Sequence, residues 1–402
     1  MIQAAYDVIV VGAGPAGAIA ARKAAESGMD TLLIEKRLEI GTPVRCGESF
    51  ELHTASQYLE DIPNQPWVNT ITRYFSIHNT KGDCVVVPPI SPSIICDRKI
   101  FDREVAYTAA NAGVQVLVNA RAESLLQDQD GAVVGLKINC MGSPLDVYSK
   151  VVIAADGTES QLARWAGLKS IPALSDLYVG TQFLVSGLSG QIRTDTSHYY
   201  VGEAIAPGGY VWVFPKSADT ANIGIVISGD RAEGTSAQGH LEGFLQEVFP
   251  RARSVLGQVT GGIPVTGGLK RLVTDGLMVV GDAAHQADPL TAGGIVLGMV
   301  AGDYAGTAAA QCIREGDVRA QSLSRYEKRW RERFGKQQRS LRTVRRMLTK
   351  MDSDLLDGLI RTAAGYDMTR ISPAKAMIHM LTKHPRLLIE ARVLINSGLI
   401  MK

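Results

Sequence analysis

The hydrophobic pattern is most regular at the start of the chain. Residues 8–11 are apolar and β-branched, a glycine-bearing turn occupies residues 12–17, and an alanine-rich stretch over residues 16–25 ends before Gly28. A second apolar run covers residues 31–34. Short β-branched runs are typical of strands buried in a parallel sheet, and the alanine-rich stretch favours a helix. The pattern therefore predicts a strand, a turn, a helix and a second strand.

Further along, the pattern shifts towards shorter segments. Residues 99–112 predict a helix, and the Asp130-Gly131 turn predicts a hairpin before a strand at residues 133–138. Later aromatic or β-branched runs, separated by Gly, Pro and Ser, predict an inserted antiparallel sheet. The remaining predictions are strands at residues 114–118, 151–155, 181–185, 198–201, 210–214, 223–227 and 277–280, and a helix at residues 240–248.

The first turn has the residues that a phosphate-binding turn needs. Gly12 permits a tight turn, Gly14 lets the backbone approach a phosphate, and Gly17 lets the helix pack close to the strand. Pro15 suits the first turn of a helix, and an anion is stabilised at the positive N-terminal end of that helix. The strand, turn and helix together predict a dinucleotide site.

Two carboxylates indicate which dinucleotide is bound. Glu35 follows the second strand, about twenty residues after the turn, where a carboxylate accepts hydrogen bonds from an adenosine ribose. Gly281-Asp282 follows the predicted strand at residues 277–280 and could hold a polyol. A nicotinamide domain needs no second aspartate from a distant part of the chain, whereas FAD has a ribityl chain to hold. The pair predicts FAD.

These elements predict an α/β fold with three parts. The first is a Rossmann-like FAD-binding domain, made of residues 1–177 and 271–325. The second is an inserted antiparallel β-sheet substrate domain at residues 178–270. The third is a C-terminal helical segment at residues 326–402.

Composition excludes several classes. The 42 basic and 40 acidic residues nearly balance, so the chain is no obvious nucleic-acid binder. The five cysteines include no CxxC pair, which argues against a disulfide framework and a zinc ribbon. His285 follows Asp282 at a metal-like spacing, but no second histidine or cysteine accompanies it, so no metal is expected. Without a signal peptide or membrane span we expect a cytoplasmic protein.

The C-terminal part leaves alternatives open. Residues 325–350 are rich in Lys and Arg, and they form either a solvated helix face or a surface that contacts an anionic membrane peripherally at the inner face of the cell membrane. Apolar residues beyond this run predict amphipathic helices that cap a substrate slot or bind a partner. They are Leu355, Leu356, Leu359, Ile360, Met377, Leu381, residues 387–389 and residues 393–395.

Several motifs carry a family resemblance. They are residues 12–17, the Asp156-Gly157 turn, Gly281-Asp282 with Pro289 and residues 293–295, residues 43–48 (Pro-Val-Arg-Cys-Gly-Glu) and residues 210–215 (Tyr-Val-Trp-Val-Phe-Pro). With these the chain resembles the geranylgeranyl reductase family of the p-hydroxybenzoate hydroxylase-like flavoproteins, most closely the archaeal digeranylgeranylglycerophospholipid reductases. The resemblance extends from the N-terminus to at least Arg333. Family members often have glycine where this chain has Ser49.

The resemblance implies an FAD enzyme that saturates isolated double bonds of geranylgeranyl chains, above all on archaeal ether-lipid precursors. It also implies a set of cofactor-binding residues: Ala16, Glu35, Cys46, Gly47, Arg98, Ala122, Asp282, Gly294 and Ile295. Asp282 would hold the ribityl or pyrophosphate region, and Gly294 and Ile295 would lie against the flavin ring. From the residues alone, Arg98 could equally form a surface ion pair with Asp97.

The aromatic strand supplies the expected substrate site. Tyr210, Trp212 and Phe214 alternate with two valines, so the three rings share one sheet face. Such a stripe is usually ordinary core, but the resemblance favours a slot for a long apolar chain. An unactivated alkene needs a proton as well as a hydride from reduced flavin. The candidate for this catalytic acid is Cys46, and His53 and His285 are its rivals. Arg45, next to Cys46, would favour the thiolate form of the cysteine over the acid form.

Other functions share these motifs. A flavin monooxygenase would act on an activated aromatic with dioxygen, and a flavin halogenase would have Trp-x-Trp-x-Ile-Pro in place of residues 210–215. A non-catalytic flavoprotein could bind a prenyl lipid without turnover. The chain has no iron–sulfur cysteine spacing and no second Rossmann fingerprint. Electrons must then arrive from NADPH, ferredoxin or another reduced carrier.

Overall fold

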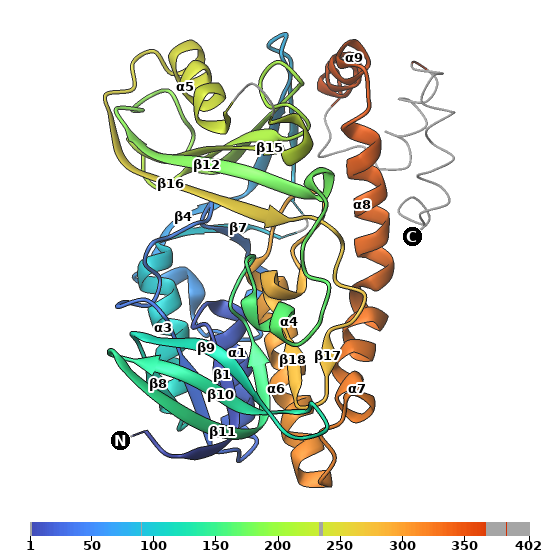
Figure 1. The fold of residues 1–402 in the computed structure, drawn as a ribbon. Helices are drawn as coiled ribbons and strands as arrows, with labels where there is room; N and C mark the ends of the chain where they lie inside the picture. The colour runs from blue at the N-terminus through green and yellow to red at the C-terminus, as the bar shows by residue number, and fades with distance from the viewer. Residues whose placement is uncertain (1, 90, 233–235, 367–382, 384–402) are drawn as a thin grey trace. The chain divides into compact units, whose positions relative to one another are not determined.

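The computed structural model describes residues 2–89, 91–232, 236–366 and 383 (Figure 1). It divides the chain into two compact units. The first unit contains residues 1–44, 98–172 and 264–338, and the second contains residues 45–97, 173–263 and 339–402.

The first unit contains an eight-stranded sheet in which a parallel core is extended by antiparallel strands. The main order is β17-β18-β11-β1-β2-β8, and β9 and β10 continue antiparallel from β11. The pairs from β18 through β11, β1 and β2 to β8 are parallel. The bounds are β1 Ala5–Val11, β2 Thr31–Ile34, β8 Gln115–Leu117, β9 Ala120–Gln127, β10 Val133–Cys140, β11 Ser143–Ala154, β17 Val273–Thr274 and β18 Leu277–Val279.

Helices of the first unit pack closely because small residues face one another. A Cβ atom at Gly302 would lie 2.2 Å from the carbonyl oxygen of Ala16, so this glycine lets α6 approach α1. The bounds are α1 Pro15–Glu26, α3 Arg98–Asn111, α4 Gln161–Trp165, η4 Gly281–Ala284, α6 Ile295–Glu315, α7 Ala320–Trp330 and a π-helical turn η5 Arg331–Gly335.

The second unit is built on a seven-stranded sheet with the order β16-β12-β15-β14-β13-β5-β6, and it has a three-stranded sheet with the order β3-β7-β4. The strands are β3 Ser49–Glu51, β4 Val68–Thr72, β5 Tyr74–His78, β6 Cys84–Val87, β7 Ser93–Cys96, β12 Leu177–Ser186, β13 Thr196–Val201, β14 Tyr210–Pro215, β15 Thr220–Ser228 and β16 Ser254–Pro264. The helices are α2 Leu52–Ala55, η1 Ile62–Asn64, η2 Leu174–Asp176, η3 Gly229–Arg231, α5 Ala237–Val248 and α9 Ser353–Ala364, together with most of α8 Lys336–Leu348.

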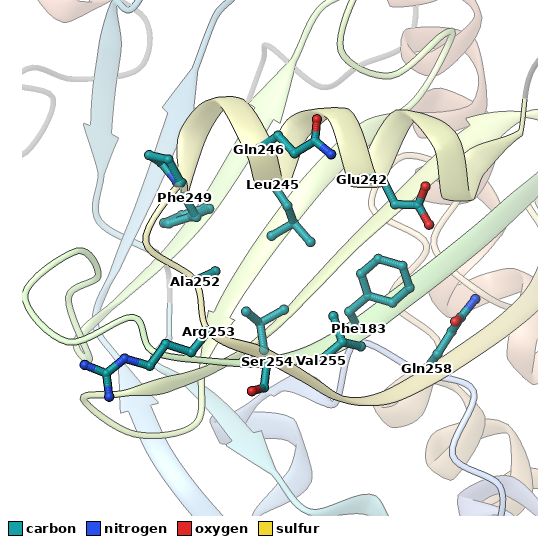
Figure 2. Close-up of a pocket in the computed structure, with 12 residues that line it drawn as sticks. Phe183, Glu242, Leu245, Gln246, Phe249, Ala252, Arg253, Ser254, Val255 and Gln258 are labelled. Atoms are coloured by element: carbon teal, nitrogen blue, oxygen red, sulfur yellow. The ribbon is translucent and has the colours of Figure 1, made fainter.

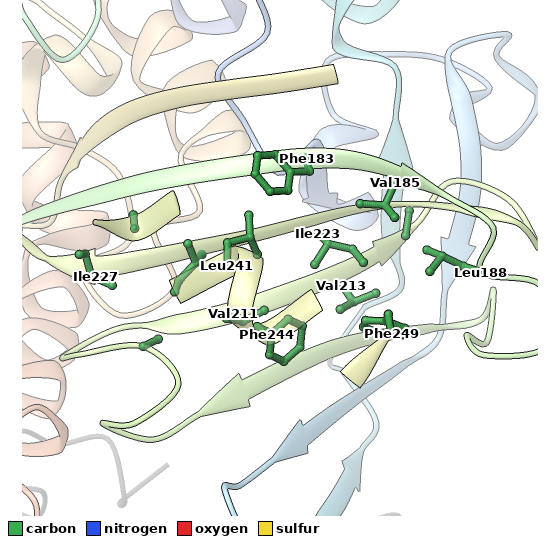
Figure 3. Packing of buried hydrophobic residues seen from close by; sticks show 14 residues of the cluster. Phe183, Val185, Leu188, Val211, Val213, Ile223, Ile227, Leu241, Phe244 and Phe249 are labelled. Atoms are coloured by element: carbon green, nitrogen blue, oxygen red, sulfur yellow. The ribbon is translucent and has the colours of Figure 1, made fainter. Parts of the chain in front are cut away.

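One face of the seven-stranded sheet is an apolar core under α5. Val211, Val213 and Ile223 project from the sheet towards Leu241 and Phe244 of α5 (Figure 3). All five side chains are buried. Burial of a Val, Leu, Ile or Phe side chain contributes about 1.5–3 kcal/mol, so this cluster holds α5 on the sheet.

The α/β class, the Rossmann-like parallel sheet and the C-terminal helices are as predicted. The compact units nevertheless divide the chain at other positions than the expected domains, 1–177 with 271–325, 178–270 and 326–402. Residues 45–97 belong to the second unit because β5 pairs with β13. That pair is parallel, whereas β12 to β15 of the inserted sheet pair antiparallel as predicted.

The other two differences have equally local causes. Residues 264–270 lie in the first unit, where the Leu269 amide donates to the carbonyl oxygen of Ala284. Residues 326–338 also belong there, because α7 packs on α6. The expected helices at Leu355, Leu356, Leu359 and Ile360 form α9. The apolar positions from Met377 onward lie outside the described residues.

Candidate functional site

The parallel strands of the first unit end at one edge of the sheet. Val11 is level with Ile34 on one side and with Ala154 on the other, and Ala154 is level with Val279. The chain therefore leaves the sheet at the same level before Gly12, before Glu35 and close to Asp282. Ligands of open α/β sheets bind at this carboxyl edge.

The Gly12–Gly17 turn is closed towards the protein and open on one side. A Cβ atom at Gly12, which has φ +103°, would lie 2.3 Å from the Ala155 oxygen, and one at Gly17 would lie 1.9 Å from the Gly12 oxygen. No atom lies within 4 Å of a Cβ atom built on Gly14. Gly14 is the N-cap of α1 and offers no side-chain cap, so a phosphate can meet the helix terminus there.

Glu35 is held at the end of β2. One carboxylate oxygen accepts the Ala13 amide at 3.1 Å and the other accepts the Arg37 amide at 2.9 Å. The Ala120 amide donates to the Glu35 carbonyl at 2.9 Å, so β9, with the buried Ala122, begins beside this glutamate. The carboxylate is thus fixed where a ribose would bind.

Asp282 meets the first turn from a distant part of the sequence. A Cβ atom at Gly281 would lie 2.9 Å from the Cβ of Ala16, which makes the two turns neighbours. An Asp282 carboxylate oxygen lies 3.1 Å from the Cβ position of Gly294, the N-cap of α6. Burial raises the pKa of Asp282, against the opposing charge of Arg98. Within the described part of the chain, no hydrogen-bond donor pairs with its side chain.

These observations fit an FAD molecule. Asp282 is partly buried, its carboxylate can accept hydrogen bonds, and the hydroxyl groups of a ribityl chain are suitable donors. The glycine turn has open space beside Gly14, where a pyrophosphate can approach the backbone, and it packs tightly against Ala155 on its other side. Arg98 forms a buried two-hydrogen-bond ion pair with Asp102, at 2.6 and 2.7 Å, which the sequence reasoning had not considered.

In the second unit, the aromatic strand β14 has the predicted two-faced pattern. Tyr210, Trp212 and Phe214 are ring neighbours along one face, with centroids 6.1 and 6.2 Å apart, while the two valines between them point into the core under α5. The pattern also missed contributors to this aromatic face. Tyr199 packs against Phe75, Tyr210 and Phe214, and Tyr178 meets Tyr210 edge-on.

A polar side chain fixes the central indole. Trp212 donates from Nε1 to Oε1 of Gln182 at 3.0 Å, and Gln182 donates from Nε2 to the Cys46 carbonyl at 2.9 Å. Gly224 lies opposite Trp212 in the register, and a Cβ atom there would lie 2.1 Å from the indole. The glycine therefore leaves room for the ring to lie over β15.

The loop at residues 46–48 packs onto the same aromatic face. A Cβ atom at Gly47 would lie 2.9 Å from the Phe214 ring. Glu48, at φ 66°, is buried, and its carboxylate accepts hydrogen bonds from Lys216, at 2.7 Å, and from Asn222. The Glu48 amide donates to Cys46 Sγ at 3.2 Å, and this sulfur is partly buried. The sequence reasoning missed Gln182, Lys216 and Asn222, which fix this loop.

A groove on the opposite face is separate from the aromatic face. Its volume is about 410 Å³, and it lies between α5 and the strands β12 and β16 (Figure 2). Phe183, which lines it, is part of the apolar core under α5. The groove therefore contributes nothing to a slot over Trp212.

The two histidines considered as rival acids differ in environment. His53 is exposed, and its backbone amide donates a hydrogen bond to the carboxylate of Glu51, the N-cap of α2. His285 is buried, with Nε2 on the Ser170 carbonyl at 2.9 Å and Nδ1 on the Thr266 hydroxyl at 3.2 Å. Burial lowers the pKa of His285 to about 4. It is neutral at pH 7 and both ring nitrogens are engaged, so the structure gives it a structural role.

A buried neutral histidine makes stability depend on pH. Unfolding returns the His285 pKa to about 6.5, so between pH 6.5 and 4 the unfolded chain binds a proton that the folded chain does not. We expect the free energy of unfolding to fall by up to about 3 kcal/mol across this window. Chemical denaturation from pH 4 to 8 should show a shallower slope in His285→Asn, which tolerates the left-handed backbone at φ 56°. The exposed control His53→Asn should keep the wild-type slope, and an unchanged slope in His285→Asn would contradict the assignment.

All five cysteines lie among the described residues, and they form no disulfide there. In residues 2–89, 91–232, 236–366 and 383 no group of three or more His, Cys, Asp or Glu side chains is placed to hold a metal ion. Across the same residues no helix has both the length and the apolar composition needed to cross a membrane.

Family models match both parts of the site. The model of the geranylgeranyl reductase catalytic domain matches residues 176–263, and that of FAD dependent oxidoreductases matches residues 7–171. Solved structures agree with this. A geranylgeranyl bacteriochlorophyll reductase-like protein from Thermoplasma acidophilum has a TM-score of 0.89 and 33% identity over 97% of this chain and 99% of its own. A flavin-dependent brominase, at 20% identity and a TM-score of 0.67 over 99% of this chain and 94% of its own, shares the fold alone.

Curated relatives extend the match over the whole chain. The digeranylgeranylglycerophospholipid reductase of Methanocella arvoryzae is 38% identical over 97% of this chain and 99% of its own length. That of Methanosarcina acetivorans is 43% identical over 82% of this chain and 81% of its own. The chain therefore belongs to the digeranylgeranylglycerophospholipid reductase family and is an FAD-dependent oxidoreductase of the geranylgeranyl reductase type.

Proposed function

We propose that this chain saturates isolated double bonds in the geranylgeranyl chains of a digeranylgeranylglycerophospholipid. The relatives that carry this name support the substrate class. The observation that carries the proposal is the aromatic face of β14, where three rings line one side of a strand whose other side is ordinary core. Such a face suits a long apolar chain.

The cofactor residues are assigned from the carboxyl edge of the parallel sheet and from the family resemblance. Bound and reduced, FAD supplies the hydride. The glycine turn takes the pyrophosphate, Glu35 the ribose, and Asp282 the ribityl chain. The full proposed set is Gly12, Gly14, Ala16, Gly17, Glu35, Cys46, Gly47, Arg98, Ala122, Asp282, Gly294 and Ile295.

The aromatic residues would stabilise the carbocation that forms when the alkene is protonated. Tyr210, Trp212 and Phe214 would line the slot and exclude water that could trap a carbocation. A dry aromatic ring attracts a cation by about 2 kcal/mol. Gln182 supports this arrangement because it accepts the indole N–H at 3.0 Å and so satisfies the polar edge of the ring within the protein.

Cys46 is the proposed proton donor. Its sulfur is partly buried, and the loop that carries it lies against Trp212 and Phe214 through Gly47. The sulfur accepts the Glu48 amide at 3.2 Å, and a thiol is also a hydrogen-bond donor through its S–H group, so Cys46 has the chemistry that a proton donor needs. Electrons are proposed to arrive from NADPH, ferredoxin or another reduced carrier, and the lipid from a membrane that the protein contacts peripherally.

Anaerobic single-turnover measurement tests the function. Protein reduced by dithionite is mixed with digeranylgeranylglyceryl phosphate, and flavin absorbance is followed together with lipid mass. We expect reoxidation with mass gains of hydrogen pairs. In Cys46→Ser we expect reoxidation at least about 100-fold slower with flavin content unchanged, since general acids contribute about 10²–10⁴-fold. Cys140→Ser, a buried cysteine in β10, is the control and should retain the rate.

Other outcomes would replace the proposal. Flavin that stays reduced with the lipid, yet reoxidises in oxygen while an aromatic compound gains one oxygen atom, would indicate a monooxygenase. Tight lipid binding without reoxidation would indicate a lipid-carrying flavoprotein. A full rate in Cys46→Ser would leave the reductase intact and remove the cysteine as its acid.

A further inference from the structure

The basic run at residues 325–350 is only in part a solvated face. Three arginines within about one turn of α8 converge on a single carboxylate in the same unit. Arg342, Arg345 and Arg346 all donate to Asp176 of η2, which is 4% exposed. These four residues are called the arginine cluster below.

Asp176 has no capacity left for these cations. Its Oδ1 accepts Arg342 Nε and Arg345 Nη2, and its Oδ2 accepts Arg342 Nη2 and Arg346 Nη2. Four donors fill the four lone-pair positions of a carboxylate. The arginines lower the pKa of Asp176, although burial opposes them, so the carboxylate stays charged. Three positive charges thus meet one negative charge.

Donors remain unused around this cluster. Within the described residues no second carboxylate pairs with the three arginines. Arg345 is 2% exposed, and its buried Nε has no hydrogen-bond partner there. Arg346 uses only Nη2 and is half-exposed, and Nη1 of Arg342 is also unused. A buried guanidinium N–H without an acceptor is costly, and an added anion would relieve the cost.

The cluster adjoins the aromatic face. The Arg345 guanidinium lies over the Tyr178 ring at 5.5 Å, and Tyr178 meets Tyr210 edge-on with centroids 6.3 Å apart. Tyr210 in turn neighbours Trp212 at 6.1 Å. A continuous row of side chains therefore runs from the cationic cluster to the proposed slot, all within the second unit. An amphiphile with an apolar chain and an anionic end matches this row.

We propose that the arginine cluster binds the phosphate ester of the prenyl lipid whose chain lies on the aromatic face. The inference rests on the proposed function and adds the head-group site to it. Guanidinium groups match phosphate because their donors are planar and can pair with two oxygens. The two excess charges balance a phosphomonoester dianion, and Arg346 and Arg342 reach it from the solvent side.

Paired substrates test the site. The KM of digeranylgeranylglyceryl phosphate and that of uncharged digeranylgeranylglycerol are measured in wild type, Arg346→Gln and Arg342→Gln. We expect each substitution to raise the KM of the phospholipid about tenfold more than that of the neutral lipid, since a charge-assisted hydrogen bond contributes about 1.5–3 kcal/mol. Arg361→Gln is the control: this exposed arginine of α9 pairs with Asp83, and its substitution should change neither KM.

Two further measurements distinguish the phosphate of the substrate from phosphate groups at a membrane surface. Inorganic phosphate should compete with the phospholipid in wild type and less so in Arg346→Gln. A substitution that weakens cosedimentation with phosphatidylglycerol vesicles, but leaves the KM of micellar phospholipid unchanged, would assign the arginines to the membrane surface and overturn the proposal. Equal effects on both lipids would overturn it too.

Failure of the proposed function would be recognised separately. In that case wild-type protein reoxidises with neither lipid. The head-group inference is then decided by the Kd of each lipid, measured through quenching of tryptophan fluorescence. A phosphate preference that Arg346→Gln abolishes supports the site, and equal Kd values in wild type overturn it.

Discussion

Gly14→Ala is expected to yield a folded protein that purifies without FAD. Gly14 has φ −71° and ψ 175°, which alanine adopts freely, and no protein atom lies within 4 Å of the added Cβ. The only consequence of the methyl group is to occupy the space through which a pyrophosphate approaches the N-terminus of α1. Loss of charge-assisted backbone contacts of about 1.5–3 kcal/mol weakens FAD binding about 10- to 150-fold.

The measurement is flavin content per protein and the Kd of added FAD, together with thermal unfolding of both apoproteins. Gly243→Ala, in an exposed turn of α5 with nothing within 4 Å of its Cβ, is the matched control. It should retain FAD and gain about 1 kcal/mol in free energy of unfolding, because glycine disfavours a helix interior. Full retention of FAD by Gly14→Ala would remove the pyrophosphate from this turn.

The glycine turn, Glu35 and Asp282 could be singled out from the sequence, because the first two lie close together in the chain and the third is a residue that a flavin requires. The glycine turn, the β-branched strand before it and Glu35 all lie within the first 35 residues, and the period of each element is read directly. Gly281-Asp282 was matched to them through the chemistry of a flavin. The structure makes the two turns neighbours, with the Gly281 Cβ position 2.9 Å from Ala16.

The second unit was harder to predict because its site depends on strand register. Gln182 meets Trp212 only because β12 and β14 both pair with β15, with Gly224 between them. Residues 45–97 gave no strand prediction, since β5 and β6 are short and β5 pairs in parallel with β13, which follows about 120 residues later. The sequence around a polar residue in a strand does not predict which residue it meets on the neighbouring strand.

Arg98 illustrates a signal that was present but not used. Asp102 follows it by four residues, the spacing at which opposite charges meet on a helix, and α3 begins at Arg98, one residue before the helix predicted at residues 99–112. By contrast, no sequence rule predicts that three arginines of the basic run converge on Asp176, because that carboxylate lies about 170 residues earlier in the chain. Tertiary packing decides such a cluster.

Gly224→Ala is expected to disable the slot while FAD stays bound. Its Cβ would lie 2.1 Å from the Trp212 indole, so the ring must move and give up its hydrogen bond to Gln182. Overpacking costs about 1–3 kcal/mol in free energy of unfolding.

We expect lipid-dependent flavin reoxidation to slow at least about tenfold, since a barrier raised by about 1.4 kcal/mol already does so. Gly257→Ala in the exposed part of β16, whose added Cβ would approach nothing closer than 3.8 Å, is the matched control and should keep wild-type rate and stability. The chain has four tryptophans, and the difference in fluorescence between each variant and wild type reports the change at Trp212. The glycine turn, Glu35 and Asp282 lie in the first unit and Trp212 in the second, so flavin content should match wild type in both variants. If Gly224→Ala shifts the indole emission yet reoxidises at the wild-type rate, Trp212 does not line the slot; if it loses FAD instead, the effect is not confined to the aromatic face.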